Sequence, residues 1–268
     1  MKTEKKSFFN IPAVQTILAS VLCIVVGLLV GYIVLLAINS KGANEAIVTL
    51  LKNYLIYPST PAKMKYLGNT LVKTAPLLMC ALSIQFCYKT GLFNIGAAGQ
   101  YVAGAGACLF CALQLKLPWI ACLIAAAVAG ALFGSVVGLL KAYANVNEVI
   151  SGIILTLVIG GALAGIGAAF LYLTGYEQWS VTQTSVPGMG FNGIAATFLG
   201  GLHPIGTIFS SYFIQHITSG GAFLDKNVYP SQISDLISAV IIYLCGFVLF
   251  FKLFLNKRHS SKKGGTSK

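Results

Sequence analysis

The sequence predicts an all-α protein, a polytopic bundle of transmembrane helices with broken or re-entrant segments. Of its 268 residues, 57% are hydrophobic and only 9% are charged, whereas a soluble domain carries about 25% charged residues. Four long stretches contain no charge at all: residues 7–40, 90–115, 117–140 and 149–176. Each is long enough for a helix that crosses a hydrocarbon core, which takes about 20 residues. Because lipid cannot satisfy exposed backbone groups, we expect these crossing segments to be helical.

The net charge of +12 does not indicate a nucleic-acid partner, because the basic residues lie in loops and tails and not on a face with interleaved aromatics. Basic flanks tend to stay on the cytoplasmic side of a membrane. We therefore expect both termini in the cytoplasm. The predicted organisation is a short N-terminal tail (1–13), a membrane domain (14–255) and a basic C-terminal tail (256–268).

The hydropathy pattern predicts six full crossings, which matches two cytoplasmic termini. The first apolar run is too long for the core of a signal peptide, so it is interpreted as a retained helix. Residues 44–57 are expected to form a short amphipathic element on the outside, closed by Pro58 and Pro61. The crossing helices are predicted over residues 14–38, 67–88, 95–115, 119–141, 149–173 and 232–254.

Glycines at helical spacing indicate close packing between the predicted helices. Gly130, Gly134 and Gly138 lie four residues apart, and Gly161 and Gly165 repeat that spacing. Small residues four apart let two helix backbones approach each other. This pattern supports a packed bundle and carries no further functional information.

Residues 188–217 are apolar but interrupted, and neither half is long enough to cross. Gly200, Gly201 and Pro204 break any helix between them. We expect a re-entrant helical hairpin, since irregular backbone at membrane depth survives only against protein or beside a water-filled cavity.

Two glycine-rich interruptions are the candidate polar path, because broken helices can offer free amides and carbonyls to a substrate. The first combines Gly91, Gly96 and Gly99 with the amides of Asn94 and Gln100. Asn94 is also a possible cap for the next helix. The second break adds Asn192 to Gly200, Gly201 and Pro204. A tight interhelical turn without any ligand explains each break equally well, so both interpretations stay open.

No arrangement of residues suggests catalysis, a metal site or a cofactor. Catalytic and phosphate-loop motifs do not occur, so the chain is not expected to be an enzyme or to hydrolyse ATP itself. Cys108 and Cys111 have metal-ligand spacing but no second pair, and we interpret the cysteines as small buried hydrophobes. Glu148 and Asp235 are expected at helix ends, and His203 and His216 are expected to be structural. The scarcity of buried charge disfavours a proton- or sodium-driven carrier.

The stretch Gly91–Gln100, GLFNIGAAGQ, closely resembles the signature of the membrane permeases of bacterial ABC importers for nucleosides and simple sugars. This branch is related to the ribose and branched-chain amino-acid permeases. Two further stretches agree in order: NVNEVISGIIL (145–155) and VPGMGFNGIAATFLGGLHPIG (186–206). The resemblance covers most of residues 67–255, and three ordered motifs together are specific.

The resemblance implies a permease subunit in a bacterial cell membrane. Its partners would be a second permease subunit, two cytoplasmic ATPase subunits and an external substrate-binding lipoprotein, with a nucleoside or a simple sugar as substrate. The residues expected along the path are Phe93, Asn94, Gln100, Phe191 and Asn192. Their aromatic faces would stack on a base and their amides would meet its polar edges.

The sequence departs from the family pattern in two places. Many relatives have Glu where this chain has Ala98, so a charge-dependent role is not carried over. The chain also lacks a long stretch between NEVIS (147–151) and GALAG (161–165), which in relatives holds the loop that docks on the ATPase. Residues 149–173 then resemble a fusion of two family helices. An inactive or regulatory subunit, or an ATP-independent channel or carrier, therefore remains an alternative.

Overall fold

The computed structural model describes residues 12–144, 150–179, 187–230, 232–245 and 247, and within them every regular element is a helix. The all-α prediction is therefore confirmed. Both terminal tails and Glu148 lie outside the described residues. The elements are α1 (Pro12–Ile38), α2 (Ala43–Lys52), the 3₁₀ helix η2 (Asn53–Ile56), α3 (Thr60–Lys89), α4 (Ala97–Leu113), α5 (Trp119–Ala144), α6 (Ile150–Tyr172), α7 (Met189–Leu199), α8 (Pro204–Gly220), the 3₁₀ helix η3 (Gly221–Phe223) and α9 (Ile233–Cys245).

The start of α3 corrects the prediction that this helix begins near residue 67. Pro61 was expected to close the preceding element, but it lies in the first turn of α3. Proline is tolerated there because the N–H groups of the first turn have no partner within the helix. A second proline, Pro76, lies inside α3 without ending it.

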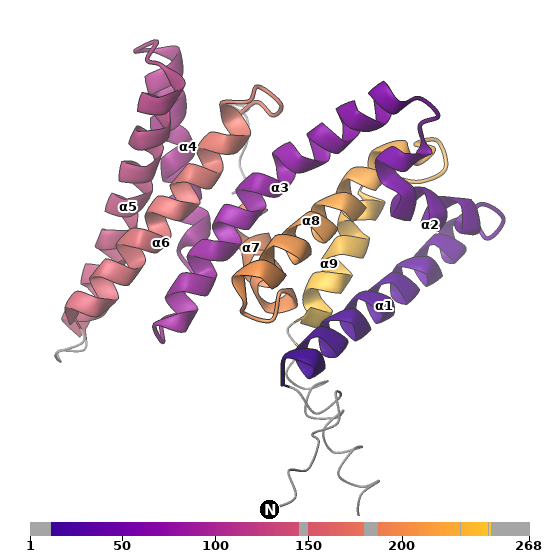
Figure 1. Cartoon of the computed structure of the whole chain (residues 1–268), viewed down its shortest axis with the longest axis horizontal. Coiled ribbons are helices and arrows are strands. Elements are labelled where there is room, and N and C mark those ends of the chain that lie inside the picture. The colour runs from indigo at the N-terminus through magenta and orange to yellow at the C-terminus, as the bar shows by residue number, and fades with distance from the viewer. Residues whose placement is uncertain (1–11, 145–149, 180–186, 231, 246, 248–268) are drawn as a thin grey trace, which may run out of the picture.

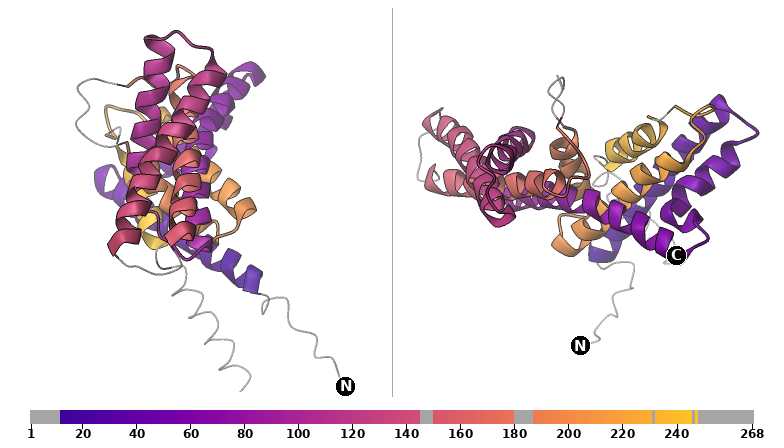
Figure 2. Two further views of the ribbon diagram at one scale, coloured as in Figure 1. Left: turned by 90° about the vertical axis from the view of Figure 1, so that its left-hand side faces the viewer. Right: turned by 90° about the horizontal axis from the view of Figure 1, so that it is seen from above.

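The helices form two groups joined by α3 (Figure 1). One group contains α4, α5 and α6, and the other contains α1, α2, α8 and α9. Seen from above in Figure 2, the groups lie on either side of α3, with α7 between them. The core of the second group buries Leu35 of α1, Ile217 of α8 and Ile241 of α9. The first group packs through α6, which contacts α3, α4 and α5.

Glycines set the distance between the helices of the first group. A Cβ added at Gly130 of α5 would lie 2.2 Å from the carbonyl oxygen of Gly161 of α6. One added at Gly104 of α4 would lie 2.4 Å from the Cα of Gly165. Only glycine permits such contacts, so the packing role predicted for Gly130, Gly161 and Gly165 is confirmed.

Three helices of the described part are long and apolar enough to cross a membrane: Val14–Ile38, Thr60–Lys89 and Trp119–Val136. The count of six crossings stays a prediction. The start of α1, the end of α3 and the turn between α7 and α8 lie toward the same lower side of Figure 1.

The interrupted segment forms the expected hairpin, with α7 and α8 joined by residues 200–203. Gly201 has φ +66° and Leu202 has φ +58°. The tip extends to the side chain of Thr16, close to the beginning of α1, because a Cβ added at Gly201 would lie 2.5 Å from Thr16 Cγ2. The hairpin therefore ends at the same side of the molecule as the start of α1.

Candidate transport path

Asn94 and Gln100 form a buried pair of side-chain amides. Asn94 Nδ2 donates to Gln100 Oε1 at 2.8 Å, and Gln100 Nε2 donates back to Asn94 Oδ1 at 3.3 Å. Asn94 Nδ2 also lies 3.3 Å from the hydroxyl oxygen of Ser83 on α3. Asn94 is 1% exposed and Gln100 is 0% exposed. We call Ser83, Asn94 and Gln100 the amide cluster.

The amide cluster corrects the expectation that Asn94 caps the following helix. The residue at the cap position of α4 is Gly96, and no side chain bonds to the first turn. Asn94 is directed instead toward α3 and toward Gln100. Ser83 belongs to the cluster although nothing in the sequence marked it, because it looks like an ordinary small polar residue within an apolar helix.

Glycines of two other helices make room for the amide cluster. A Cβ added at Gly134 of α5 would lie 3.3 Å from Gln100 Nε2, and one added at Gly160 of α6 would lie 3.3 Å from Asn94 Nδ2. Helices α3, α4, α5 and α6 therefore all converge on the cluster. Its hydrogen bonds within the protein replace those that lipid cannot supply.

Helix α4 begins well inside the first group and not at its edge. Gln100, in the first turn of α4, faces Gly134 of α5. Helix α5 continues ten residues beyond Gly134 to Ala144, which is about 15 Å at 1.5 Å per residue. The N-terminus of α4, whose first N–H groups have no partner within the helix, thus lies beside the middle of α5 and next to the amide cluster.

The two glycine-rich interruptions meet at this level. A Cβ added at Gly190, in the first turn of α7, would lie 2.4 Å from the Cα of Ala98 in the first turn of α4. The N-termini of both helices therefore lie in contact, although about ninety residues separate them in the sequence. The cap residue of α7 is Gly188, so no side chain of the cap residue bonds to the first turn of α7. We call this contact the α4–α7 junction.

The remaining predicted path residues flank the junction without joining the amide cluster. Phe93 is 41% exposed, Phe191 is 51% exposed and Asn192 is half-buried. Within the described residues, no hydrogen bond links the Asn192 side chain to Asn94 or Gln100, and its backbone N–H donates to Gly188 at 2.8 Å. The structure thus joins Asn94 to Gln100 and leaves Phe93, Phe191 and Asn192 at accessible positions.

The predicted backbone breaks all fall at helix ends or at close contacts. Gly91 has φ +82° in the turn after α3. Gly96 caps α4, and Gly99 packs against Phe133 of α5. Gly200 ends α7, Gly201 forms the tip of the hairpin, and Pro204 is the first residue of α8.

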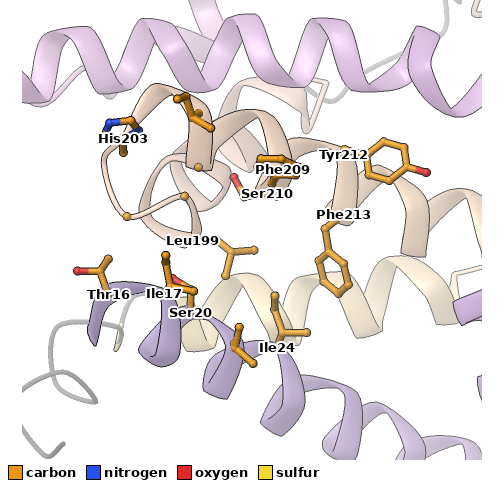
Figure 3. Close-up of a pocket in the computed structure, with 15 residues that line it drawn as sticks. Thr16, Ile17, Ser20, Ile24, Leu199, His203, Phe209, Ser210, Tyr212 and Phe213 are labelled. Carbon is orange, nitrogen blue, oxygen red and sulfur yellow. The ribbon is translucent and has the colours of Figure 1, made fainter. Parts of the chain in front are cut away.

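A cavity of about 810 Å³ lies between α1 and the α7–α8 hairpin (Figure 3). Gly200 and Gly201 are among its lining residues, so the second backbone break borders an open space. The α1 side of the cavity is lined by residues from Thr16 to Ile24, which the sequence marked only as part of a crossing helix. We call it the α1–α8 cavity.

Comparison with known protein families decides what this architecture is. The family described as the branched-chain amino acid transport system / permease component matches residues 66–159 and 153–246. The chain belongs to this permease family. It is accordingly a multi-pass membrane transport subunit and not an enzyme. Membership implies that an ATPase component and a substrate-binding component act with it.

Three curated permeases are similar to this family member. A nucleoside ABC transporter permease protein, NupB, of Lactococcus lactis is 22% identical, with 95% of this chain and 97% of the relative covered. A guanosine ABC transporter permease protein, NupP, of Bacillus subtilis is 32% identical, covering 46% of this chain and 39% of the relative. A glucose ABC transporter permease protein, TsgB13, of Haloferax volcanii is 34% identical, covering 56% and 38%.

The matches also bear on the length of this permease. The alignment with the Lactococcus protein extends over 366 residues, whereas this chain has 268, so many positions of the relative have no counterpart here. The matches to the guanosine and glucose permeases span less than half of those relatives. No solved structure matches the chain significantly.

Proposed function

We propose that the chain is the permease subunit of an ABC importer for nucleosides, with related simple sugars as the next substrate class. The observation that carries this proposal is the similarity to a nucleoside permease along 95% of the chain. The similarity to a guanosine permease supports the same substrate class. In this proposal a second permease subunit, two cytoplasmic ATPase subunits and an external lipoprotein complete the importer. Both termini lie in the cytoplasm of a bacterial cell.

The substrate is proposed to pass beside the α4–α7 junction, where the two helix N-termini meet. Two helix N-termini direct free N–H groups toward this region, as in transporters that bind substrates at broken helices. Phe191 and Asn192 are accessible on α7, so an aromatic face and an amide are available to a nucleobase. Phe93, in the turn before α4, offers a second aromatic face to the nucleobase. The proposed role of Asn94 and Gln100 is to hold that turn in place through their mutual hydrogen bonds.

Uptake of a radiolabelled nucleoside tests the passage. Cells without their own nucleoside uptake would express the chain with its ATPase and lipoprotein partners. Asn192→Ala and Phe191→Ala are expected to lower uptake several-fold, since each removes one contact of the kind that is worth about 1 kcal/mol. Asn227→Ala, in the exposed loop before α9, is the control. Unchanged uptake in both α7 variants at equal membrane abundance would exclude this passage.

The length difference from the Lactococcus protein favours one second candidate function. The two family matches overlap at residues 153–159. This overlap lies within α6, at the point where the sequence lacks the stretch that in relatives holds the ATPase-docking loop. Helix α6 continues through this point as a single helix of 23 residues. A chain without the docking loop would act as a regulatory or inactive subunit beside a complete permease.

Co-purification separates the two candidates. An active permease is expected to hold its ATPase in a stable complex, and the nucleoside with its lipoprotein should stimulate ATP hydrolysis. A regulatory subunit would bind a complete permease and change its activity without holding an ATPase itself. Failure to bind either partner would contradict both candidates.

A further inference from the structure

We propose that the α1–α8 cavity binds one molecule of anionic phospholipid, with an acyl chain inside the cavity and the headgroup at the Thr16–His203 end. The site is separate from the α4–α7 junction and does not depend on which substrate the permease carries.

Exposed apolar side chains of α1 and α8 line the cavity. Ile17 of α1 is 62% exposed and Phe209 of α8 is 70% exposed, and both line the cavity. Helix α1 is long and apolar enough to cross a membrane. A space between such exposed apolar side chains is reached from lipid more readily than from water, because filling it with water would leave apolar surface hydrated.

The shape of the cavity fits an extended chain. Along α1 it extends from Thr16 to Ile24, which is about 12 Å at 1.5 Å per residue. Along the hairpin it extends from the turn at Gly201 to Phe213 of α8. Figure 3 shows Thr16 and His203 at one end of this space and Phe213 near the other.

Two polar side chains that line the cavity, Ser210 and Tyr212, bond elsewhere in the protein. The Ser210 hydroxyl donates to the carbonyl oxygen of Ala196. The Tyr212 hydroxyl lies 3.1 Å from the hydroxyl of Tyr54, outside the cavity lining. Apart from Ser20, the middle of the cavity is therefore lined mostly by apolar side chains, as an acyl chain requires.

The headgroup end is the polar end. His203 is exposed, and it makes no capping hydrogen bond although it precedes the first turn of α8. The free N–H groups of that first turn favour an anion nearby. The residues that line the cavity include no Asp or Glu that would repel a phosphate.

Charge in the sequence favours an anionic headgroup over a zwitterionic one. Lys5 and Lys6 precede the start of α1 by only a few residues, and the stretch after α9 contains six basic residues and no acidic one. Basic segments beside a membrane helix attract anionic lipids electrostatically. Both stretches are expected on the same side of the membrane as the headgroup end of the cavity.

Quenching of a tryptophan by brominated lipids tests the proposal. Trp119 and Trp179 would be replaced by Phe, and Phe209→Trp would place one reporter in the cavity. The full chain would be reconstituted in vesicles that mix phosphatidylcholine with brominated phosphatidylglycerol, or with brominated phosphatidylcholine. We expect brominated phosphatidylglycerol to quench the cavity reporter to the same extent as brominated phosphatidylcholine at a mole fraction at least threefold lower. An Ile33→Trp reporter, 62% exposed in the wild type on α1 beyond the cavity, should show no headgroup preference.

Two additional variants distinguish specific lipid binding in the cavity from general contact with the bilayer. Ser20→Phe fills the cavity and should remove the preference, and His203→Ala should weaken it. Retention of normal elution from size-exclusion chromatography shows that each variant is folded. Equal quenching by both lipids in the Phe209→Trp protein would overturn the proposal. Protection of this reporter by adenosine, without any headgroup preference, would overturn it in favour of a substrate site.

Discussion

The side-chain amide of Asn53 donates a hydrogen bond to Nδ1 of His216 at 3.3 Å, although 163 residues separate the two along the chain. His216 Nε2 lies 2.9 Å from the carbonyl oxygen of Leu51. Because a carbonyl oxygen can only accept, Nε2 carries the proton and Nδ1 of the neutral ring is the acceptor. Asn53 also donates to the Thr70 hydroxyl at 3.2 Å. One histidine of α8 thus holds the α2–η2 element against the bundle.

Asn53 combines an unusual backbone conformation with its amide contacts. Its φ is +46° and its ψ is −124°, which lies outside the left-handed helical region. The side chain is 1% exposed, so its hydrogen bonds are shielded from water. His216 was expected to be structural, and its hydrogen bonds across three segments agree with that expectation.

Replacement of His216 by Phe should loosen the α2–η2 element. The change removes one of the two acceptors of the Asn53 amide and the donor to the Leu51 carbonyl oxygen. Loss of hydrogen bonds from groups that are shielded from water costs free energy. Trypsin should then cleave the detergent-solubilised protein after Lys52, which is exposed, several-fold faster than in the wild type. His203→Phe, in the hairpin turn, is the control. Equal cleavage rates in the two variants would show that His216 does not hold the element.

Replacement of either buried amide should destabilise the bundle. Asn94→Leu leaves Gln100 buried with fewer partners, and an unpaired buried polar group costs about 1–3 kcal/mol. The double variant Asn94→Leu/Gln100→Leu should be more stable than the sum of the single effects predicts, because no amide is then left unpaired. Thermal unfolding in detergent measures all three variants. Gln114→Leu, at the exposed end of α4, should change little, and additive single effects would contradict the pairing.

Replacement of Gly104 by Val should separate α4 from α6. Its added Cβ would collide with the Cα of Gly165 at 2.4 Å, and backbone cannot move aside cheaply. Overpacking of this kind typically costs about 1–3 kcal/mol. Gly106→Val is a matched control, since it lies on the same helix and its Cβ meets nothing within 4 Å. A similar loss of thermal stability in both variants would refute the close contact.

Replacement of Gly201 by Ala should destabilise the tip of the hairpin. A left-handed backbone costs an L-residue roughly 1–2 kcal/mol, and the added Cβ would also approach Thr16 Cγ2 at 2.5 Å. Gly68→Ala in α3 has no positive φ and no neighbour within 4 Å, so it should be neutral or slightly stabilising. Thermal unfolding of both variants in the same detergent measures the difference. Equal stability of the two variants would show that the left-handed backbone at position 201 does not penalise alanine.

The helices and their order were predictable because the lipid imposes one local rule. A long run without charge has to be helical wherever it crosses, so predicted ranges such as 119–141 agree closely with α5. The start of α3 was missed for an equally local reason. A proline in the first turn of a helix and one that ends the preceding element look the same in a sequence.

The candidate path was only partly predictable. The sequence marked Asn94 and Gln100 as amides beside a break, but their hydrogen bonds to each other depend on how the turn after α3 folds back. Ser83 and Gly160 carry no signal of their own, because their role arises only when α3 and α6 lie together. The cavity was missed because α1 and α8 are distant in the sequence.

By itself, the sequence determined that this chain is a bundle of membrane helices with glycine-rich interruptions, because charge, length and glycine spacing act within a single segment. Only the tertiary structure decided which interruptions meet. The contact between Gly190 and Ala98 and the bond between Asn53 and His216 both join residues far apart in the chain. Such contacts depend on the packing of whole helices against one another, and no local pattern of residues specifies that packing.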